Sequence, residues 1–251
     1  SGELRGGVED ARRRGVEGLP PGVNESSADV MGEGTGAVRF GLAAVKGVGA
    51  GAAQALVERR AGRDDGRFPD LDELYVEATS ANLTKTTMEG LVKAGAMDCY
   101  PGVRLDLLEH LDSSLRSAQT RAKDRAAGQA WLFGGDAPAA TATADGEAAA
   151  AARELSDAER RATLALEKEA LGLYLTRHPL DPYRELLAGV SPWDSRKLAD
   201  LPDRGVVTLA GIATLVEVRG TRKDPSRKFA RLRVEDLYGS TAAIAWPSTY
   251  E

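Results

Sequence analysis

Residues 45–53, VKGVGAGAA, have the composition of a turn that binds a phosphate group. Gly47 and Gly49 allow the backbone to turn tightly and to approach a phosphate closely, because glycine has no Cβ. The helix expected after them would direct free amides and the positive end of its dipole toward that phosphate. Lys46 would add a positive charge, and Val48 would anchor the turn in the core. The pattern predicts a helix-hairpin-helix that contacts the backbone of duplex DNA.

A weaker second copy of this pattern lies at residues 83–96, with Lys85, Lys93 and a single hairpin glycine, Gly95. Two such units side by side would hold both strands of a duplex through backbone contacts, which carry no sequence information. A structural alternative exists for both copies. The first would be an ordinary turn between helices, and the second a packing unit without contact to DNA. A dinucleotide-binding loop is disfavoured, because no strand precedes the first copy and a third glycine is not in place.

Residues 128–134, GQAWLFG, place an apolar pair and a glutamine where helical sequence gives way to a linker. Exposed aromatic and aliphatic side chains of this kind typically dock into a pocket of a partner protein. The candidates are Gln129, Leu132 and Phe133. In the alternative interpretation, Trp131 and Phe133 fold back on the preceding helix as a local cap.

Seven basic residues lie within residues 219–233, and only Asp224 opposes them. A basic loop with aromatic side chains on a small barrel is typical of single-strand binding, because charge follows the backbone and rings stack on bases. The predicted contacts are Arg219, Arg222, Lys223, Arg227, Lys228 and Phe229, with Arg231, Arg233 and Tyr238 nearby. A solvated hairpin loop is the alternative.

The sequence contains no evident catalytic or metal centre. His178, in RHPLDPY, is interpreted as a turn residue, because no partnered nucleophile is identifiable. The acidic pairs 64–65 and 235–236 carry no mark of a two-metal carboxylate site. A lone Cys99 and two histidines disfavour a disulfide framework and a soft-ligand metal centre, and this cysteine content suits the cytosol.

The composition is that of a soluble globular chain of one or two domains: 251 residues, 42% hydrophobic and 28% charged. No apolar run approaches the roughly 18 residues that a membrane helix needs, and no signal peptide is present, so a cytoplasmic location without membrane contact is expected. The formal charge of −5 means that any DNA binding must come from local basic patches. The first residue is serine, which suggests a fragment of a longer chain.

The elements that must position these residues change along the chain. Residues 40–127 predict successive short helices separated by glycine hinges, and Leu107, Leu108, Leu111 and Leu115 form one apolar stripe. Low-complexity sequence then predicts a flexible linker. Ser156 and Glu159 have capping-box spacing before a helix that runs to about Leu175. From residue 206 a period of two predicts three strands, 206–220, 228–236 and 240–247, which are too few for a closed barrel.

Taken in this order, the motifs resemble the alpha subunit of bacterial DNA polymerase III, a C-family DNA polymerase. The segments that carry the resemblance are LPPGVNES at 19–26, VRFGLAAVKGVG at 38–49, LVKAGAMD at 91–98, EKEALGLYLTRHPLDPY at 167–183 and VEDLYGS at 234–240. Together they extend over nearly the whole chain. The first and fourth are the most specific, because neither is generic turn or helix sequence.

The resemblance implies a mainly α fold with a tandem helix-hairpin-helix domain, then a flexible linker, a helix and a truncated OB-like β-barrel. The implied boundaries are 1–30 for the end of the fingers, 31–127 for the hairpin domain, 128–134 for a clamp-binding motif, 135–152 for the linker, 153–204 for a helical connector and 205–251 for a partial OB domain. Gln129, Leu132 and Phe133 match the family's internal motif for the sliding clamp, although Trp131 departs from it.

The whole enzyme of such a family is a Mg²⁺-dependent DNA-directed DNA polymerase whose palm carboxylates would lie upstream. This segment would therefore hold no cofactor and would not polymerise alone. The implied partners are primer-template duplex, single-stranded template, the sliding clamp and other subunits of the holoenzyme.

Two other hypotheses remain open at this stage. One is a free-standing interaction module of DNA repair or of an error-prone polymerase, and the other is a hydrolase that uses His178.

Overall fold

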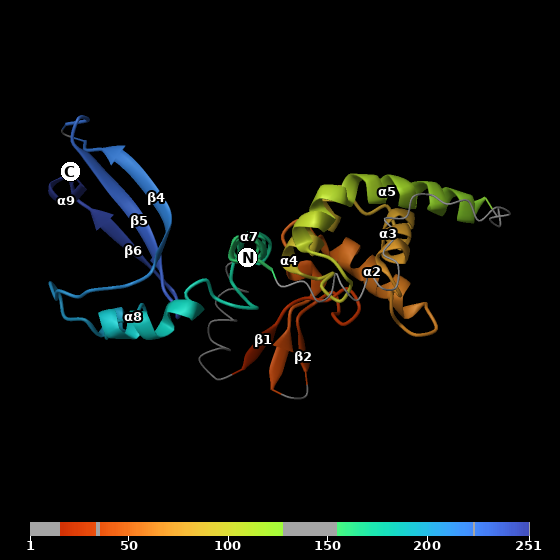
Figure 1. The fold of residues 1–251 in the computed structure, drawn as a ribbon, viewed down its shortest axis with the longest axis horizontal. Coiled ribbons are helices and arrows are strands. Elements are labelled where there is room, and N and C mark those ends of the chain that lie inside the picture. The colour runs from red at the N-terminus through yellow and green to blue at the C-terminus, as the bar shows by residue number, and fades with distance from the viewer. Residues whose placement is uncertain (1–15, 34–35, 128–154, 223, 251) are drawn as a thin grey trace. The chain divides into compact units, whose positions relative to one another are not determined.

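The computed structural model describes residues 16–33, 36–127, 155–222 and 224–250. The chain divides into two compact units between Thr176 and Arg177. The first unit contains most of the helices, and the second contains an antiparallel sheet (Figure 1). A helix-rich part followed by a β part confirms the predicted fold class at this coarse level. Within the described ranges, no helix is long and apolar enough to cross a membrane.

The first unit opens with a small sheet that the sequence did not predict. Its strands are β1 (Glu17–Leu19), β2 (Met31–Glu33) and β3 (Ala37–Arg39), in the order β1-β3-β2. β3 pairs in parallel with β1 and antiparallel with β2. Strands of three residues are too short to show a period of two, so pairing between distant segments alone defines them.

Helices follow at nearly all the predicted places in the first unit. They are η1 (Leu42–Ala44), α2 (Ala50–Ala61), α3 (Leu71–Ser80), α4 (Lys85–Ala94), α5 (Arg104–Ala126) and α7 (Asp157–Leu171). Their apolar faces form one core, in which Leu56, Leu74, Leu91 and Leu111 are fully buried. The other three leucines of the predicted α5 stripe pack against this core.

Side-chain caps explain where several of these helices begin and end. The Asp70 carboxylate accepts from the Glu73 amide before α3, and the Thr84 hydroxyl accepts from the Thr87 amide before α4. The predicted capping box of Ser156 and Glu159 is confirmed at α7. α7 ends at Leu171 rather than near Leu175, because Gly172 takes the left-handed conformation at φ +79°.

The LPPGVNES segment is attached to the helices by internal hydrogen bonds. The Asn24 side chain accepts from the Phe68 amide at 2.8 Å and donates to the Phe68 carbonyl at 3.1 Å. The Tyr100 hydroxyl donates to the same carbonyl, and the Ser26 hydroxyl donates to the Phe40 carbonyl. The Asn24 side chain thus satisfies both the amide and the carbonyl of Phe68, as a neighbouring strand would do with its backbone. These hydrogen bonds hold the LPPGVNES segment against the helices.

α7 packs against α4 and α5, and a buried carboxylate holds the chain that follows it. The Glu167 side chain is 0% exposed. It accepts hydrogen bonds from the Leu175 and Thr176 amides and from the Thr176 hydroxyl. The Arg104 guanidinium lies 3.7 Å away and also bonds Asp98. The predicted connector over 153–204 is therefore divided, because α7 belongs to the first unit and the chain from Arg177 belongs to the second.

The second unit contains η2 (Asp181–Tyr183), α8 (Arg184–Val190), η3 (Lys197–Asp200), β4 (Ile212–Gly220), β5 (Lys228–Glu235), β6 (Ser240–Ala245) and α9 (Pro247–Tyr250). The three strands form an antiparallel sheet in the order β4-β5-β6, as the period of two predicted. β4 begins at Ile212 rather than at Val206. A register shift between Ala213 and Leu215 interrupts its pairing with β5.

Candidate nucleic-acid interface

The first glycine-rich turn connects η1 to α2. Gly47 has φ +88°, a left-handed conformation in which a side chain would be strained. Val48 is buried at 5% exposure and Ala53 is fully buried, so the turn is anchored in the core as predicted. Lys46 is exposed on this turn.

The first turn of α2 presents uncapped amides to solvent. Gly49 is the N-cap residue and provides no side-chain cap. The first intrahelical hydrogen bond runs from the Ala53 amide to the Gly49 carbonyl, so the amides of Ala50, Gly51 and Ala52 precede it. No acidic residue occupies this turn. The helix dipole therefore favours an anion here, and the lack of a side chain on Gly49 and Gly51 allows a close approach.

The structure brings the N-terminus of α4 against this hairpin. The Thr87 hydroxyl donates to the Gly47 carbonyl at 3.2 Å. A Cβ on Gly90 would lie 2.6 Å from the Lys46 carbonyl oxygen, so the absence of a side chain permits the contact. Two helix N-termini, of α2 and of α4, are consequently neighbours.

Residues 81–84 connect α3 to α4 and lie at the start of the predicted second copy. Asn82 has φ +55°, and Thr84 caps α4, whose first turn carries no acidic residue. Lys85 and Thr86 at the start of α4 are exposed. The predicted second copy includes residues 83–85, but its predicted hairpin glycine is Gly95. A threonine directly before a helical period is an N-cap signal that would have located the turn correctly.

Gly95 ends α4 and does not open a helix. It has φ +81° and is buried, and a Cβ there would lie 2.1 Å from the Arg104 guanidinium. α5 begins only at Arg104. Gly95 therefore packs inside the unit, where it leaves room for an arginine.

The two lysines of the predicted second copy form ion pairs within the unit. Lys85 lies 2.7 Å from Asp112, and Lys93 lies 2.8 Å from Glu169. The hydrogen bond with Asp112 raises the pKa of Lys85 and lowers the pKa of Asp112. A phosphate near Lys85 would therefore compete with the Asp112 carboxylate for the lysine. The first turn of α2 contains no acidic residue that could compete with a phosphate for its uncapped amides.

In the second unit, the predicted basic contacts fall into two groups. Arg222, Arg227 and Lys228 lie on the exposed turn between β4 and β5 or at its end. This turn is shaped by Asp224, whose pKa is lowered by hydrogen bonds from Ser226. Arg219, Phe229, Arg231 and Arg233 instead lie on the strands. Lys223 lies outside the described residues.

The predicted clamp-binding residues Gln129, Leu132 and Phe133 also lie outside the described residues. So do the remainder of segment 128–134, the predicted linker over 135–152 and the first half of segment 1–30. The structure therefore adds nothing to these predictions.

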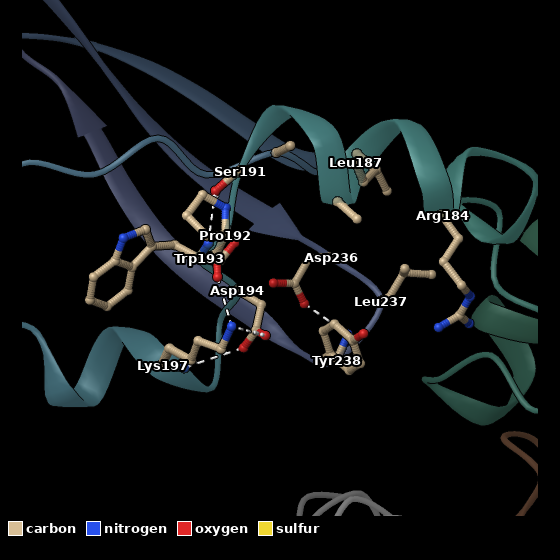
Figure 2. Close-up of a pocket in the computed structure, with 12 residues that line it drawn as sticks. Arg184, Leu187, Ser191, Pro192, Trp193, Asp194, Lys197, Asp236, Leu237 and Tyr238 are labelled. Carbon is tan, nitrogen blue, oxygen red and sulfur yellow. Dashed lines mark hydrogen bonds and ion pairs between the residues drawn. The ribbon is translucent and has the colours of Figure 1, made fainter.

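A small pocket of about 210 Å³ lies in the second unit, between α8 and the β5–β6 turn (Figure 2). Its two carboxylates are already engaged. Asp236 accepts from the amides of Ser195, Tyr238 and Gly239, and hydrogen bonds from Arg196 lower the pKa of Asp194. Over the described ranges, no group of three or more histidine, cysteine or acidic residues could hold a metal ion. The three hydrogen bonds from backbone amides make Asp236 a structural residue of the VEDLYGS turn.

His178 lies in a turn, where its backbone amide donates to Asp181 at 2.7 Å. Its Nδ1 accepts from the Leu180 amide at 3.2 Å. Both contacts stabilise the bend of the HPLDPY segment.

Comparison with known proteins identifies relatives for nearly the whole chain. A family model described as a helix-hairpin-helix motif matches residues 15–107, which include both hairpins. The DNA polymerase III subunit alpha of Thermus aquaticus is 34% identical over 250 residues, covering 97% of this chain and 19% of that protein. The namesake proteins of Mycobacterium tuberculosis and Saccharopolyspora erythraea are 32% and 29% identical over 96% of this chain and 20% of their own lengths. The chain thus spans about a fifth of the length of these relatives, and over nearly its whole length it is similar to a segment of DNA polymerase III alpha subunits.

Proposed function

We propose that this chain is the segment of a replicative DNA polymerase that holds duplex DNA and attaches the enzyme to its sliding clamp. The observation that carries the duplex part is the hydrogen bond from Thr87 to the Gly47 carbonyl, which joins the two hairpins. Because of it, the N-termini of α2 and α4 lie together, and neither first turn carries an acidic residue.

Each hairpin would contact the DNA backbone through amides of its helix N-terminus. Backbone contacts position a protein on DNA without reading the bases, which is what an enzyme that moves along every sequence requires. The amides of Ala50 and Gly51 and the Lys46 ammonium would bind at the first hairpin, and residues 84–86 at the second. In this proposal Gly95 and Lys93 have structural roles.

Substituting Lys46 by glutamate is expected to weaken duplex binding about fivefold to tenfold, and equally on all sequences. The slope of log affinity against log salt should fall by about 1, because one phosphate contact is lost. The measurement is a salt titration on two duplexes of unrelated sequence. The matched control is Lys123→Glu, the same charge change at an exposed position on α5. A loss confined to one duplex would contradict the proposed backbone contact.

The clamp part of the proposal comes from the sequence of residues 129–133, QAWLF. Apolar anchors on a peptide that docks in a pocket commonly dominate the binding energy. A tether of this kind raises processivity, because it keeps the polymerase at a high effective concentration beside the DNA.

The triple variant Gln129→Ala, Leu132→Ala, Phe133→Ala is expected to weaken binding to the cognate bacterial sliding clamp by about 100-fold or more. Calorimetry or fluorescence anisotropy measures this directly. Trp131→Ala is the matched control, since it changes the same segment and keeps the three proposed anchors. If the unmodified chain does not bind the clamp, the tether is removed from the proposal while the duplex part stands.

The second unit would be part of an OB-like domain that receives single-stranded template at its basic turn. Neutralising Arg222, Arg227 and Lys228 together should then lower the salt dependence of single-strand binding. The Mg²⁺-dependent nucleotidyl transfer of the whole enzyme is assigned to other segments, so this proposal gives the chain no catalytic step.

A further inference from the structure

The last turn of α7 contacts the backbone of the first hairpin. The Lys46 amide donates to the Ala170 carbonyl at 2.9 Å, and Ala170 is buried in the core of the first unit. The next residue of the hairpin is held by α4, because the Thr87 hydroxyl donates to the Gly47 carbonyl. Two helices therefore fix the backbone at Lys46 and Gly47, while the Lys46 side chain remains exposed.

This contact satisfies an end of α7 that the helix itself leaves open. The last carbonyls of an α-helix have no partner within the helix. α7 ends at Leu171, and the Gly172 amide donates to the Lys168 carbonyl. The Ala170 carbonyl instead accepts from Lys46, so the hairpin caps α7 and α7 in turn fixes the hairpin.

The chain that follows α7 packs against the segment that leads into the first hairpin. Leu173 and Leu175 form a small buried cluster with Phe40, which lies just before η1. Ala44 of η1 and Leu171 of α7 pack against this cluster. An apolar contact and a hydrogen bond thus hold the same short segment against the end of α7.

Polar contacts determine the course of the chain after α7. The Glu167 carboxylate, which is fully buried, accepts from the amides of Leu175 and Thr176. The Lys168 ammonium lies 4.5 Å from the centre of the Tyr174 ring. These contacts hold residues 174–176 against α7, and Glu167 thereby fixes the place of Leu175.

α7 is an addition to the helix-hairpin-helix motif. The matching family model ends at residue 107, whereas α7 begins at Asp157. In the structure α7 lies beside α4, and the ion pair of Lys93 with Glu169 at 2.8 Å joins the two helices (Figure 1). A helix outside the motif therefore contacts both the first hairpin and α4.

We infer that the end of α7 positions the first hairpin for contact with duplex DNA, with Leu175 and Glu167 as positioning residues. The inference rests on the proposed function, since it names the element that orients Lys46 and the amides of Ala50 and Gly51 toward a phosphate. Leu175 and Glu167 are buried, so they would act through the hairpin backbone and not by touching DNA. A hairpin that is already held in its binding geometry loses less conformational freedom when it binds, which favours affinity.

The experiment is a double-mutant cycle on the 251-residue chain, measured as the affinity for one duplex. Leu175→Ala alone is expected to weaken duplex binding by about tenfold or more, because the first hairpin is then free to move. Adding Lys46→Glu should cost less than about twofold further, against about fivefold to tenfold in the wild-type chain. A lysine on a displaced turn has no phosphate contact left to lose.

Two controls separate positioning from stability. Lys85→Glu, at the second hairpin, should cost the same factor with and without Leu175→Ala, to within about twofold. Leu115→Ala removes a half-buried leucine of α5 from the core of the same unit and should leave the effect of Lys46→Glu at its wild-type size. Circular dichroism checks that each variant is folded at the temperature of the binding measurement. Leu175→Val is the milder variant, and it should give a smaller change of the same kind.

Hydrogen exchange followed by NMR tests the contact in the absence of DNA. The Lys46 amide should be protected in the wild-type chain, because it donates to the Ala170 carbonyl. Leu175→Ala should raise its exchange rate by about tenfold or more, through local opening of the hairpin. The Phe68 amide, which donates to Asn24 in the same unit, is the internal reference and should keep its rate.

Three results would overturn the inference. If Lys46→Glu costs the same factor with and without Leu175→Ala, α7 stabilises the unit without positioning the hairpin, and the proposed duplex binding stands. If Leu175→Ala reduces the effects of Lys46→Glu and Lys85→Glu alike, α7 supports the unit as a whole and not the first hairpin. If Lys46→Glu has no effect in the wild-type chain, the proposed phosphate contact is itself wrong, and α7 has no contact to position.

Discussion

Replacing Glu167 by alanine is expected to lower the free energy of unfolding of the first unit by about 3–5 kcal/mol. The side chain is fully buried and is the acceptor for the Leu175 amide and for the amide and hydroxyl of Thr176. Its removal would leave these donors without their acceptor. It would also take away the carboxylate beside the buried Arg104 guanidinium. Thermal and urea denaturation followed by circular dichroism measure the loss.

A graded series makes this prediction specific to the carboxylate. Glu167→Gln keeps one acceptor oxygen for the two amides but loses the charge, so its stability should lie between wild type and Glu167→Ala. Glu169→Ala, two residues along α7, removes an exposed carboxylate paired with Lys93 and should cost about 0–1 kcal/mol. Equal losses for Glu167→Ala and Glu169→Ala would show that the buried cluster contributes no more than a surface ion pair.

Replacing Gly90 by alanine is expected to separate the two hairpins and to weaken duplex binding about tenfold or more. The new Cβ would lie 2.6 Å from the Lys46 carbonyl oxygen, and a backbone atom cannot move away as a flexible side chain can. Overpacking of this kind costs about 1–3 kcal/mol. Helix propensity acts in the opposite direction, because alanine is favoured over glycine in a helix by about 1 kcal/mol.

Gly51→Ala in α2 separates the two effects on stability. Gly51 has no heavy atom within 4 Å of its Cβ position, so the substitution should gain the helix propensity alone. The difference in unfolding free energy between the two variants should therefore be about 1–3 kcal/mol. For duplex affinity the control is Gly189→Ala in α8 of the second unit, which is also unobstructed. Unchanged duplex affinity in Gly90→Ala would show that the contact between the hairpins is not needed for binding.

Residues of three of the segments that carry the resemblance make internal hydrogen bonds in this structure. Asn24 of LPPGVNES pairs with the backbone of Phe68, Glu167 holds the end of α7, and Asp236 of VEDLYGS accepts three amides. Each is a polar side chain that satisfies backbone groups where the chain leaves regular structure. These contacts give a structural reason for the polar residue types at these three positions. The proposed DNA contacts, in contrast, use glycine and backbone amides, whose residue types are much less distinctive.

The local features were predictable from the sequence because they depend on neighbours along the chain. The capping box at Ser156, the left-handed turn at Gly47 and the period of two in β4, β5 and β6 each involve residues a few positions apart. Five segments along the sequence also indicated the resemblance to DNA polymerase III alpha subunits, and relatives of that name match 96–97% of this chain. The end of α7 was misplaced because the apolar pattern continues past Gly172, where the backbone turns left-handed.

Contacts between distant residues were decided only by the tertiary structure. The small sheet of β1, β2 and β3, the packing of α7 on α4 and the meeting of α4 with the first hairpin have no local pattern. Gly95 illustrates the reason. A glycine near lysines is compatible with a hairpin or with a helix end, and only the space taken by Arg104, nine residues on, selects the second. Arg231 and Arg233 likewise appear as part of a basic run, but strand register places them beside Phe229 and Trp246, because side chains alternate between the two faces of a sheet.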